Sequence, residues 1–121
     1  MIYRVRAKII KEKLGEFYEK LTDGTIDHQL PDGEEIVSSM KRAMLTGPGL
    51  IEWFEMCFYP TPLQHERKTQ YDSYFSEIDT ELVHSYGKIN GKSFWSYIAS
   101  MNNRQEDAKK SLYQKLLRYA P

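Results

Sequence analysis

A tight reversal between two apolar runs is the sequence feature that most constrains how this chain folds. Residues 46–49 (TGPG) hold two glycines and a proline, a composition suited to a turn. The run after them, Leu50 to Tyr59, is rich in aromatic residues, which favour β-strands. The run before them, Ile36 to Leu45, contains good helix formers from Met40 to Met44 and suits either structure. Because a short turn joins antiparallel neighbours, we predict that both runs are strands.

The N-terminal segment predicts a strand followed by a helix. Apolar and charged residues alternate with a period of two, with Tyr3, Val5, Ala7 and Ile9 on one side and Arg4, Arg6 and Lys8 on the other. The spacing of Leu14, Phe17, Tyr18 and Leu21 then follows one side of a helix. Gly24 is a suitable stop signal, and residues 25–35 read as a loop.

The second half of the chain predicts a helix, a strand, a hairpin and a final helix. Thr61 is a suitable N-cap with Pro62 in the first helical position, and the helical period continues to Ile78. Residues 80–88 read as a strand, and the pair at 90–91 (NG) predicts a hairpin turn before a strand at 94–98. An amphipathic helix follows from residue 103, with a stripe formed by Ala108, Leu112, Leu116 and Ala120.

This order, βαββαβ with an added hairpin or strand and a terminal helix, predicts a single α+β domain over residues 1–121. Right-handed crossovers give a ferredoxin-like sheet with its helices on one face and its first strand beside its third. Over roughly residues 1–90, the element order resembles the dimeric α/β-barrel proteins, in which two sheets pack face to face. The resemblance implies a homodimer, and that superfamily includes oxygenases, isomerases, haem proteins and proteins of no known activity. The elements beyond residue 90 depart from its minimal form.

Composition and charge narrow the class of protein. The 121 residues hold 17 Lys and Arg against 17 Asp and Glu. The chain has no concentrated basic stripe of the kind that nucleic acids require, so we expect no nucleic-acid partner. No apolar run reaches the length of a transmembrane helix, so we expect no membrane partner. The single cysteine, Cys57, cannot form an internal disulfide, which favours a cytoplasmic location.

The open face of the predicted sheet is where we expect a site. With Leu50, Phe54, Met56 and Phe58 placed under the helices, the other side of the aromatic run carries Trp53, Glu55 and Cys57. Arg4 and Arg6 then lie on the same open face, and His84 and Tyr86 join them from the neighbouring strand. A polar group in aromatic surroundings suits a small-molecule pocket, in which Glu55 or His84 is a candidate general base. The alternative is structural, because an Arg–Glu pair between strands also tunes register or closes an interface.

A second group of candidates begins the helix after Pro62. His65 and Glu66 lie in its first turns, where Glu66 suits the positive end of the helix dipole. Arg67 falls on the apolar stripe between Leu63 and Tyr71, which predicts a buried or half-buried partner. The functional alternative is a guanidinium directed at a carboxylate or phosphate in a cleft.

Other chemistries leave weaker signals. The three histidines are far apart and Cys57 is the sole cysteine, so we predict no metal site. A nucleophilic pair of Cys57 and His84 is geometrically possible, but a lone cysteine on a strand is more often a small buried hydrophobe. The chain has neither a glycine-rich phosphate loop nor a GxSxG motif, and we expect no cofactor.

Two functional classes follow from these residues. The first is a small-molecule-binding protein or a small cofactor-independent enzyme with a pocket on the open sheet face. The second is a non-catalytic, dimeric interaction protein whose polar sheet face is only an interface. The excess of aromatic and charged residues on one strand face favours the first class.

Overall fold

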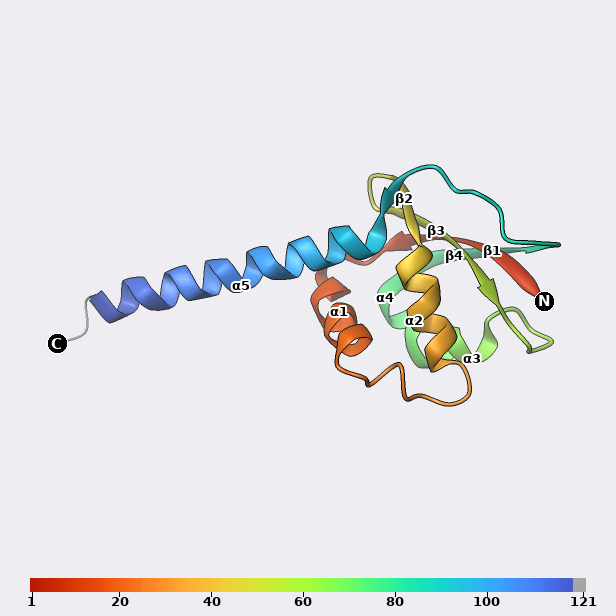
Figure 1. The fold of residues 1–121 in the computed structure, drawn as a ribbon, viewed down its shortest axis with the longest axis horizontal. Coiled ribbons are helices and arrows are strands. Elements are labelled where there is room, and N and C mark those ends of the chain that lie inside the picture. Colours follow the sequence, from red (N-terminus) through yellow and green to blue (C-terminus); the bar gives the residue numbers. More distant parts are fainter. Residues whose placement is uncertain (119–121) are drawn as a thin grey trace.

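β1 (Ile2–Ile9) lies within one open antiparallel sheet, between β4 (Phe75–Val83) and β3 (Leu50–Met56) (Figure 1). β2 (Met44–Gly47) and β5 (Lys92–Ser93) complete the strand order β4-β1-β3-β2-β5. The computed structural model describes the backbone of residues 1–118 and their side chains except those of 104–108 and 118. The predicted α+β class and the pairing of the first strand with the third are confirmed.

The helices pack on one face of this sheet (Figure 1). They are the 3-10 turn η1 (Lys11–Lys13), α1 (Leu14–Thr22), α2 (Gly33–Arg42), α3 (Gln64–Glu66), the π-helical segment η2 (Arg67–Tyr71), α4 (Asp72–Tyr74) and α5 (Phe94–Arg118). The core lies between these helices and the sheet. Its largest fully buried side chains are Trp53, Tyr71, Tyr74, Phe17 and Phe94.

The side of β1 that faces the helices is as predicted, but that of β3 is reversed. Tyr3 and Val5 are buried, and they lie directly opposite Glu55 and Trp53 in the β1–β3 register. Directly paired residues share a face, so Trp53, Glu55 and Cys57 belong to the core, and their predicted place on the open face is wrong. Both sides of β3 are largely apolar, so its alternation alone does not select a face; its register with β1 does.

Residues 33–42 form α2, so the prediction of a long strand at 36–45 is wrong. Ile36, Val37 and Met40 recur with helical spacing and are buried. Acidic residues occupy the first turn of α2 and basic residues its last turn, which matches the helix dipole. The predicted reversal is nevertheless present, since Pro48 and Gly49 connect β2 to β3. Only the short β2 remains of the strand that we predicted.

The predicted second helix begins later than expected. Leu63 adopts a left-handed conformation with φ of 55°, which is uncommon for a bulky residue, and the helix starts at Gln64 rather than Pro62. Its middle, η2, is π-helical, which shifts the side chains that follow relative to a regular helix. β4 therefore begins at Phe75, five residues before the predicted strand at 80–88.

The C-terminal region contains one long helix in place of the predicted hairpin. α5 begins at Phe94, so the predicted strand at 94–98 is wrong, and the two-residue strand β5 pairs with β2. Phe94 and Ile98 are one helical turn apart, and both are buried. Gly91 lies so close to the next strand that a Cβ atom there would stand 2.2 Å from the carbonyl oxygen of Leu45. The predicted stripe positions at 108 and 120 fall outside the described side chains.

Candidate functional site

Glu55 is a charged residue type buried in the centre of the core, with 0% of its surface exposed. Its Oε1 accepts hydrogen bonds from Nε1 of Trp53 at 2.9 Å and from the hydroxyl of Tyr71 at 2.5 Å. Its Oε2 has no partner among the described residues. Burial raises the pKa of Glu55 well above its ordinary value, more than the two donated hydrogen bonds lower it. The carboxyl group of Glu55 is therefore stabilised in its protonated form.

Glu66 extends this buried acid toward the surface. It is 1% exposed, and the neighbouring carboxyl groups of Glu55 and Asp32 both act on its pKa. Burial raises the pKa of Glu66 above its ordinary value. Its Oε1 is, like Oε2 of Glu55, a buried acceptor without a partner among the described residues. Two adjacent carboxyl groups in a dry environment favour sharing of a proton over two negative charges.

His65 is the solvent end of the same chain of polar groups. Its Nδ1 lies 2.6 Å from Oδ2 of Asp32, and a third of its side chain is exposed. Nε2 of Gln29 donates to Oδ1 of Asp32 at 2.9 Å and to the hydroxyl of Thr69 at 2.9 Å. We call the four residues His65, Asp32, Glu66 and Glu55 the acid chain. It runs from the protein surface to the centre of the core.

Sequence reasoning found part of the acid chain and missed the rest. The sequence pattern singles out Glu55 on a strand and, separately, His65 and Glu66 at a helix start, with Glu66 assigned to the helix dipole rather than to the core. Asp32 lies in a segment that reads as an ordinary loop, and nothing in the local pattern predicts that it is buried. Of the other candidates on β3 and after it, Trp53 donates its indole N–H to Glu55. Cys57 is buried, and because this burial raises the pKa of its thiol, the thiol is not activated as a nucleophile.

The open face of the sheet carries a compact ion-pair cluster. Oε1 of Glu52 accepts from Nε of Arg4 at 3.1 Å and from Nε of Arg6 at 2.8 Å. Burial tends to raise the pKa of Glu52, but hydrogen bonds from Arg6 and Arg4 outweigh it and lower that pKa. The two arginines therefore lie on the predicted face, but their carboxylate partner is Glu52 rather than Glu55. The register selects Glu52, because it lies directly opposite Arg6.

Neither Tyr86 nor His84 forms a hydrogen bond or ion pair with either cluster among the described residues, although the Arg4 guanidinium and the Tyr86 ring both contact the ring of Phe54. Tyr86 packs edge-on against Phe54, and the guanidinium of Arg42 lies 5.1 Å from its ring centre. These residues border a shallow pocket of about 210 Å³. His84 is exposed beside Met1, at the rim of another open pocket of about 450 Å³. Among the described residues, His84 forms no hydrogen bond with Cys57 or with Glu55, whose side chains are buried.

Arg67 makes a surface ion pair, and the prediction of a buried or half-buried partner is wrong. Its Nε donates to Oδ1 of Asp72 at 2.9 Å, with 41% of the Arg67 side chain and 53% of the Asp72 side chain exposed. The π-helical segment η2 begins at Arg67, so a regular helical period does not describe this position. Arg67 faces neither a cleft nor the acid chain.

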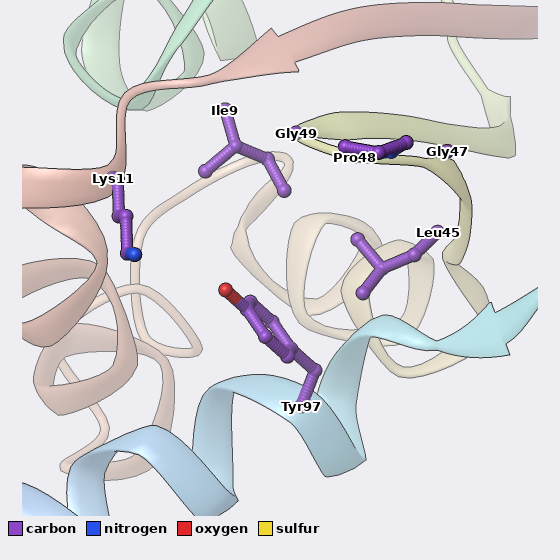
Figure 2. Close-up of a pocket in the computed structure, with 7 residues that line it drawn as sticks. All are labelled: Ile9, Lys11, Leu45, Gly47, Pro48, Gly49 and Tyr97. Atoms are coloured by element: carbon purple, nitrogen blue, oxygen red, sulfur yellow. The ribbon is translucent and has the colours of Figure 1, made fainter.

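The described surface has two further shallow pockets beside the turn between β2 and β3. One, of about 330 Å³, lies between that turn and the ring of Tyr97 on α5, with Ile9 and Lys11 on its far side (Figure 2). The other, of about 510 Å³, shares Leu45 and Tyr97 and extends to Lys92. Both linings are mainly apolar, and neither contains a carboxylate or histidine.

α5 extends beyond the rest of the molecule and ends far from it (Figure 1). Its first turns are anchored: Phe94 and Ile98 are buried, and the Trp95 ring lies 5.5 Å from Nζ of Lys41 on α2. Further along, the side chains of residues 109–117 are exposed. The large apolar ones are Leu112, Tyr113, Leu116 and Leu117, with 56–64% of their surface exposed.

The exposed residues continue the side of α5 that is buried nearer its start. Leu112 and Leu116 follow Ile98 by about four and five turns of 3.6 residues. Leu112 and Leu116 therefore share the side of α5 that carries Ile98. The polar residues Asn102 and Lys109 lie between them and Ile98 on that side, so the exposed apolar stripe is confined to residues 112–117. Single exposed apolar residues are common, whereas these four are neighbours on one helix and form an exposed apolar patch.

No three His, Cys, Asp or Glu side chains in the described part of the chain are placed to hold a metal ion. No helix in that part combines the length and the apolar character needed to cross a membrane.

Comparisons of the chain with protein-family models, with curated proteins and with solved structures give no match.

Proposed function

We propose that this protein is a non-catalytic interaction protein that associates through α5. The observation that carries the proposal is the exposed apolar stripe at Leu112, Tyr113, Leu116 and Leu117 on a helix that has left the body of the molecule. Exposure of this much apolar side chain is unfavourable in water, and a partner that covers it gains the free energy of burial. The proposal takes the second of the two functional classes that the sequence leaves open.

The chemistry of the polar clusters supports the same choice. A pocket on the open sheet face needs free polar groups, whereas Arg4 and Arg6 there are occupied by Glu52. Glu55 and Glu66 have raised pKa values that would suit a general acid, yet both are buried, and none of the shallow pockets described above reaches them. Perturbed carboxyl groups are common in structural networks as well as in active sites.

We also propose that the sheet and its helices form a ferredoxin-like fold. The strand order β4-β1-β3-β2 supports a ferredoxin-like arrangement, to which β5 and α5 are additions. We further propose that the protein is a homodimer. A face-to-face barrel would bury the Arg4–Glu52–Arg6 cluster, whereas pairing through α5 would cover apolar side chains, so we assign the dimer contact to α5.

The test is the mass of the protein in solution by light scattering after gel filtration. We expect the wild type to have about twice its chain mass of 14.3 kDa at micromolar concentrations. A variant with Leu112→Ser and Leu116→Ser should have the mass of one chain. Phe58→Ser is the control, because Phe58 is 86% exposed, more than Leu112 or Leu116, but lies outside α5, and it should leave the mass unchanged. A wild type with the mass of one chain throughout would exclude the proposal.

A small-molecule role is the second candidate, and it rests on the acid chain. Glu55 and Glu66 each present a buried acceptor oxygen without a partner among the described residues, which suits a ligand that donates hydrogen bonds. His65 is the partly exposed end of the acid chain, and a small amine or guanidinium compound would enter there. Thermal-shift measurements with such compounds test this role. A midpoint increase that Glu66→Gln abolishes would support it, and no increase with any of them would exclude it.

A further inference from the structure

The distal half of α5, residues 109–117, is basic as well as apolar. Residues 109–118 include four Lys and Arg but no Asp or Glu. Lys109, Lys110 and Lys115 are all exposed, beside the apolar stripe. A partner for this surface must therefore offer both apolar contact and negative charge.

The chain carries a surface of that kind elsewhere. Residues 21–40 include five acidic residues but no Lys or Arg. Three of these acids, Asp23, Asp27 and Glu34, are exposed, and Leu30 between them is 86% exposed. Hydrogen bonds from Thr25 lower the pKa of Asp23, which keeps that carboxylate ionised. We call residues 23–35, which connect α1 to α2 and include the first turn of α2, the acidic segment.

The two surfaces of one chain do not meet. α5 leaves the body so that its distal half points away from α1, α2 and the loop between them (Figure 1). α5 has 25 residues and is therefore about 37 Å long, whereas a body of about 100 residues has a radius of gyration near 13 Å. The projecting half is thus long enough to lie along the body of a neighbouring molecule.

We infer that the distal half of α5 in one copy packs against the acidic segment of a second copy, which returns the same contact. The inference rests on the proposed function and specifies its partner. Reciprocal contacts of this kind close a two-fold dimer and leave no unpaired arm. The opposite charges of the two surfaces, on a chain with equal numbers of acidic and basic residues, select a second copy over an unrelated acidic protein or an anionic lipid surface.

Charge reversal tests the contact from both sides. Lys109→Glu, Lys110→Glu and Lys115→Glu together should weaken dimerisation by about tenfold or more, because like charges would then face each other. Asp23→Lys, Asp27→Lys and Glu34→Lys together should do the same. Mixing the two triple variants should restore a dimer containing one chain of each, since both contacts of the mixed dimer then pair opposite charges. Combining all six changes in one chain should restore the homodimer.

The control for the α5 variant is a second triple variant that also replaces three lysines by glutamate, at exposed positions outside α5. Lys68, Lys88 and Lys92 are exposed, and their replacement by Glu should leave the dissociation constant within about twofold. Circular dichroism of every variant establishes that the fold is intact. Any variant that fails to fold is replaced by its individual single substitutions, measured in the same way.

Failure of the inference is distinguishable from failure of the proposed function. If the triple variants weaken the dimer but the mixture does not restore it, α5 contacts another surface and the inference is wrong. The inference is equally wrong if the Leu112→Ser, Leu116→Ser variant is monomeric while neither charge reversal has an effect. In both cases the proposed function stands. A monomeric wild type that sediments with vesicles of anionic phospholipid would overturn both.

Discussion

Individual carboxyl groups in this protein behave in opposite ways according to where the register places them. Glu52 and Glu55 are three residues apart on β3 and lie on opposite faces of the sheet. The pKa of Glu52 is lowered by hydrogen bonds from two arginines despite partial burial, and that of Glu55 is raised by its burial. Glu52 therefore ties two strands together as a carboxylate, whereas Glu55 is accommodated in the core as an acid.

We expect the stability of the protein to fall as the pH rises above the range of an ordinary carboxyl group. Because the folded-state pKa of Glu55 lies above its ordinary value of 4.5, the folded protein binds more protons than the unfolded chain between those two values. The contribution is complete below pH 4.5 and is lost as the pH rises through the folded-state pKa. Urea unfolding measured from about pH 5 upward should show this decrease in the free energy of unfolding.

Glu55→Gln should flatten that pH dependence and preserve the fold. The glutamine carbonyl can still accept from Trp53 and Tyr71, and its amide can donate toward Glu66, with no proton to lose. Part of the slope should remain, because burial also raises the pKa of Glu66. Glu81→Gln, at an exposed position on β4, is the control and should keep the wild-type slope. An unchanged slope in Glu55→Gln would mean that Glu55 is ionised in the core.

Arg67→Ala should cost less than about 0.5 kcal/mol of unfolding free energy, because both partners of its ion pair are largely exposed. Urea unfolding at low and high salt measures this change in the free energy of unfolding. Lys68→Ala, at the neighbouring exposed position, is the control. A loss of several kcal/mol would indicate a buried carboxylate left without its partner.

At the scale of elements, α2 completes the sheet where β2 ends. Oε1 of Glu35 accepts from the backbone N–H of Met56 at 3.0 Å, and the guanidinium of Arg42 donates to the carbonyl of Phe54 at 3.0 Å. The two side chains also pair with each other at 3.0 Å. β2 has only four residues, so without these contacts the far end of β3 would expose an unpaired edge. A helix at 33–42 places Glu35 and Arg42 where they can bond the backbone of β3, which explains why this segment forms a helix rather than the strand that we predicted from the turn.

Glu35→Ala should therefore destabilise the protein by about 1–2 kcal/mol, because the N–H of Met56 loses its acceptor and Arg42 loses its partner. Glu16→Ala removes the same kind of charge from an exposed position in the first turn of α1 and should change the unfolding free energy by less than about 0.5 kcal/mol. Equal effects of the two changes would contradict a special role for Glu35. Chemical denaturation of both variants measures the difference.

At the scale of the whole molecule, the body and the projecting half of α5 differ in what stabilises them. The body has a continuous core between the sheet and its helices. Residues 109–117 are all exposed. Isolated helices of such length are marginally stable in water, so we expect this part of α5 to gain stability from association.

The thermal midpoint of the wild type should accordingly rise with protein concentration, because unfolding is then coupled to dissociation. In the Leu112→Ser, Leu116→Ser variant the midpoint should be independent of concentration. Differential scanning calorimetry over a hundredfold range of concentration provides the measurement. A wild-type midpoint that does not change over this range would contradict association through α5.

Local patterns in the sequence were sufficient to predict those elements for which only one secondary structure and one orientation fit the pattern. The alternation of charged and apolar residues over β1 determined both its structure and the side that faces the core. The glycines around Pro48 determined the reversal before β3. The spacing from Leu14 to Leu21 determined α1. In β1 and α1 one face is clearly apolar and the other clearly polar, so burial of the apolar face is enough to determine the orientation.

Only the tertiary structure decided the remaining features, because their local patterns have more than one solution. Both sides of β3 are apolar, so pairing with β1 was needed to bury Glu55. Phe94 and Ile98 fit a strand or a helix until packing against α1 and α2 selects the helix. Asp32, His65 and Glu66 come together from a loop and a helix start that are more than 30 residues apart. Contacts over such separations depend on how whole elements pack, and no local period records them.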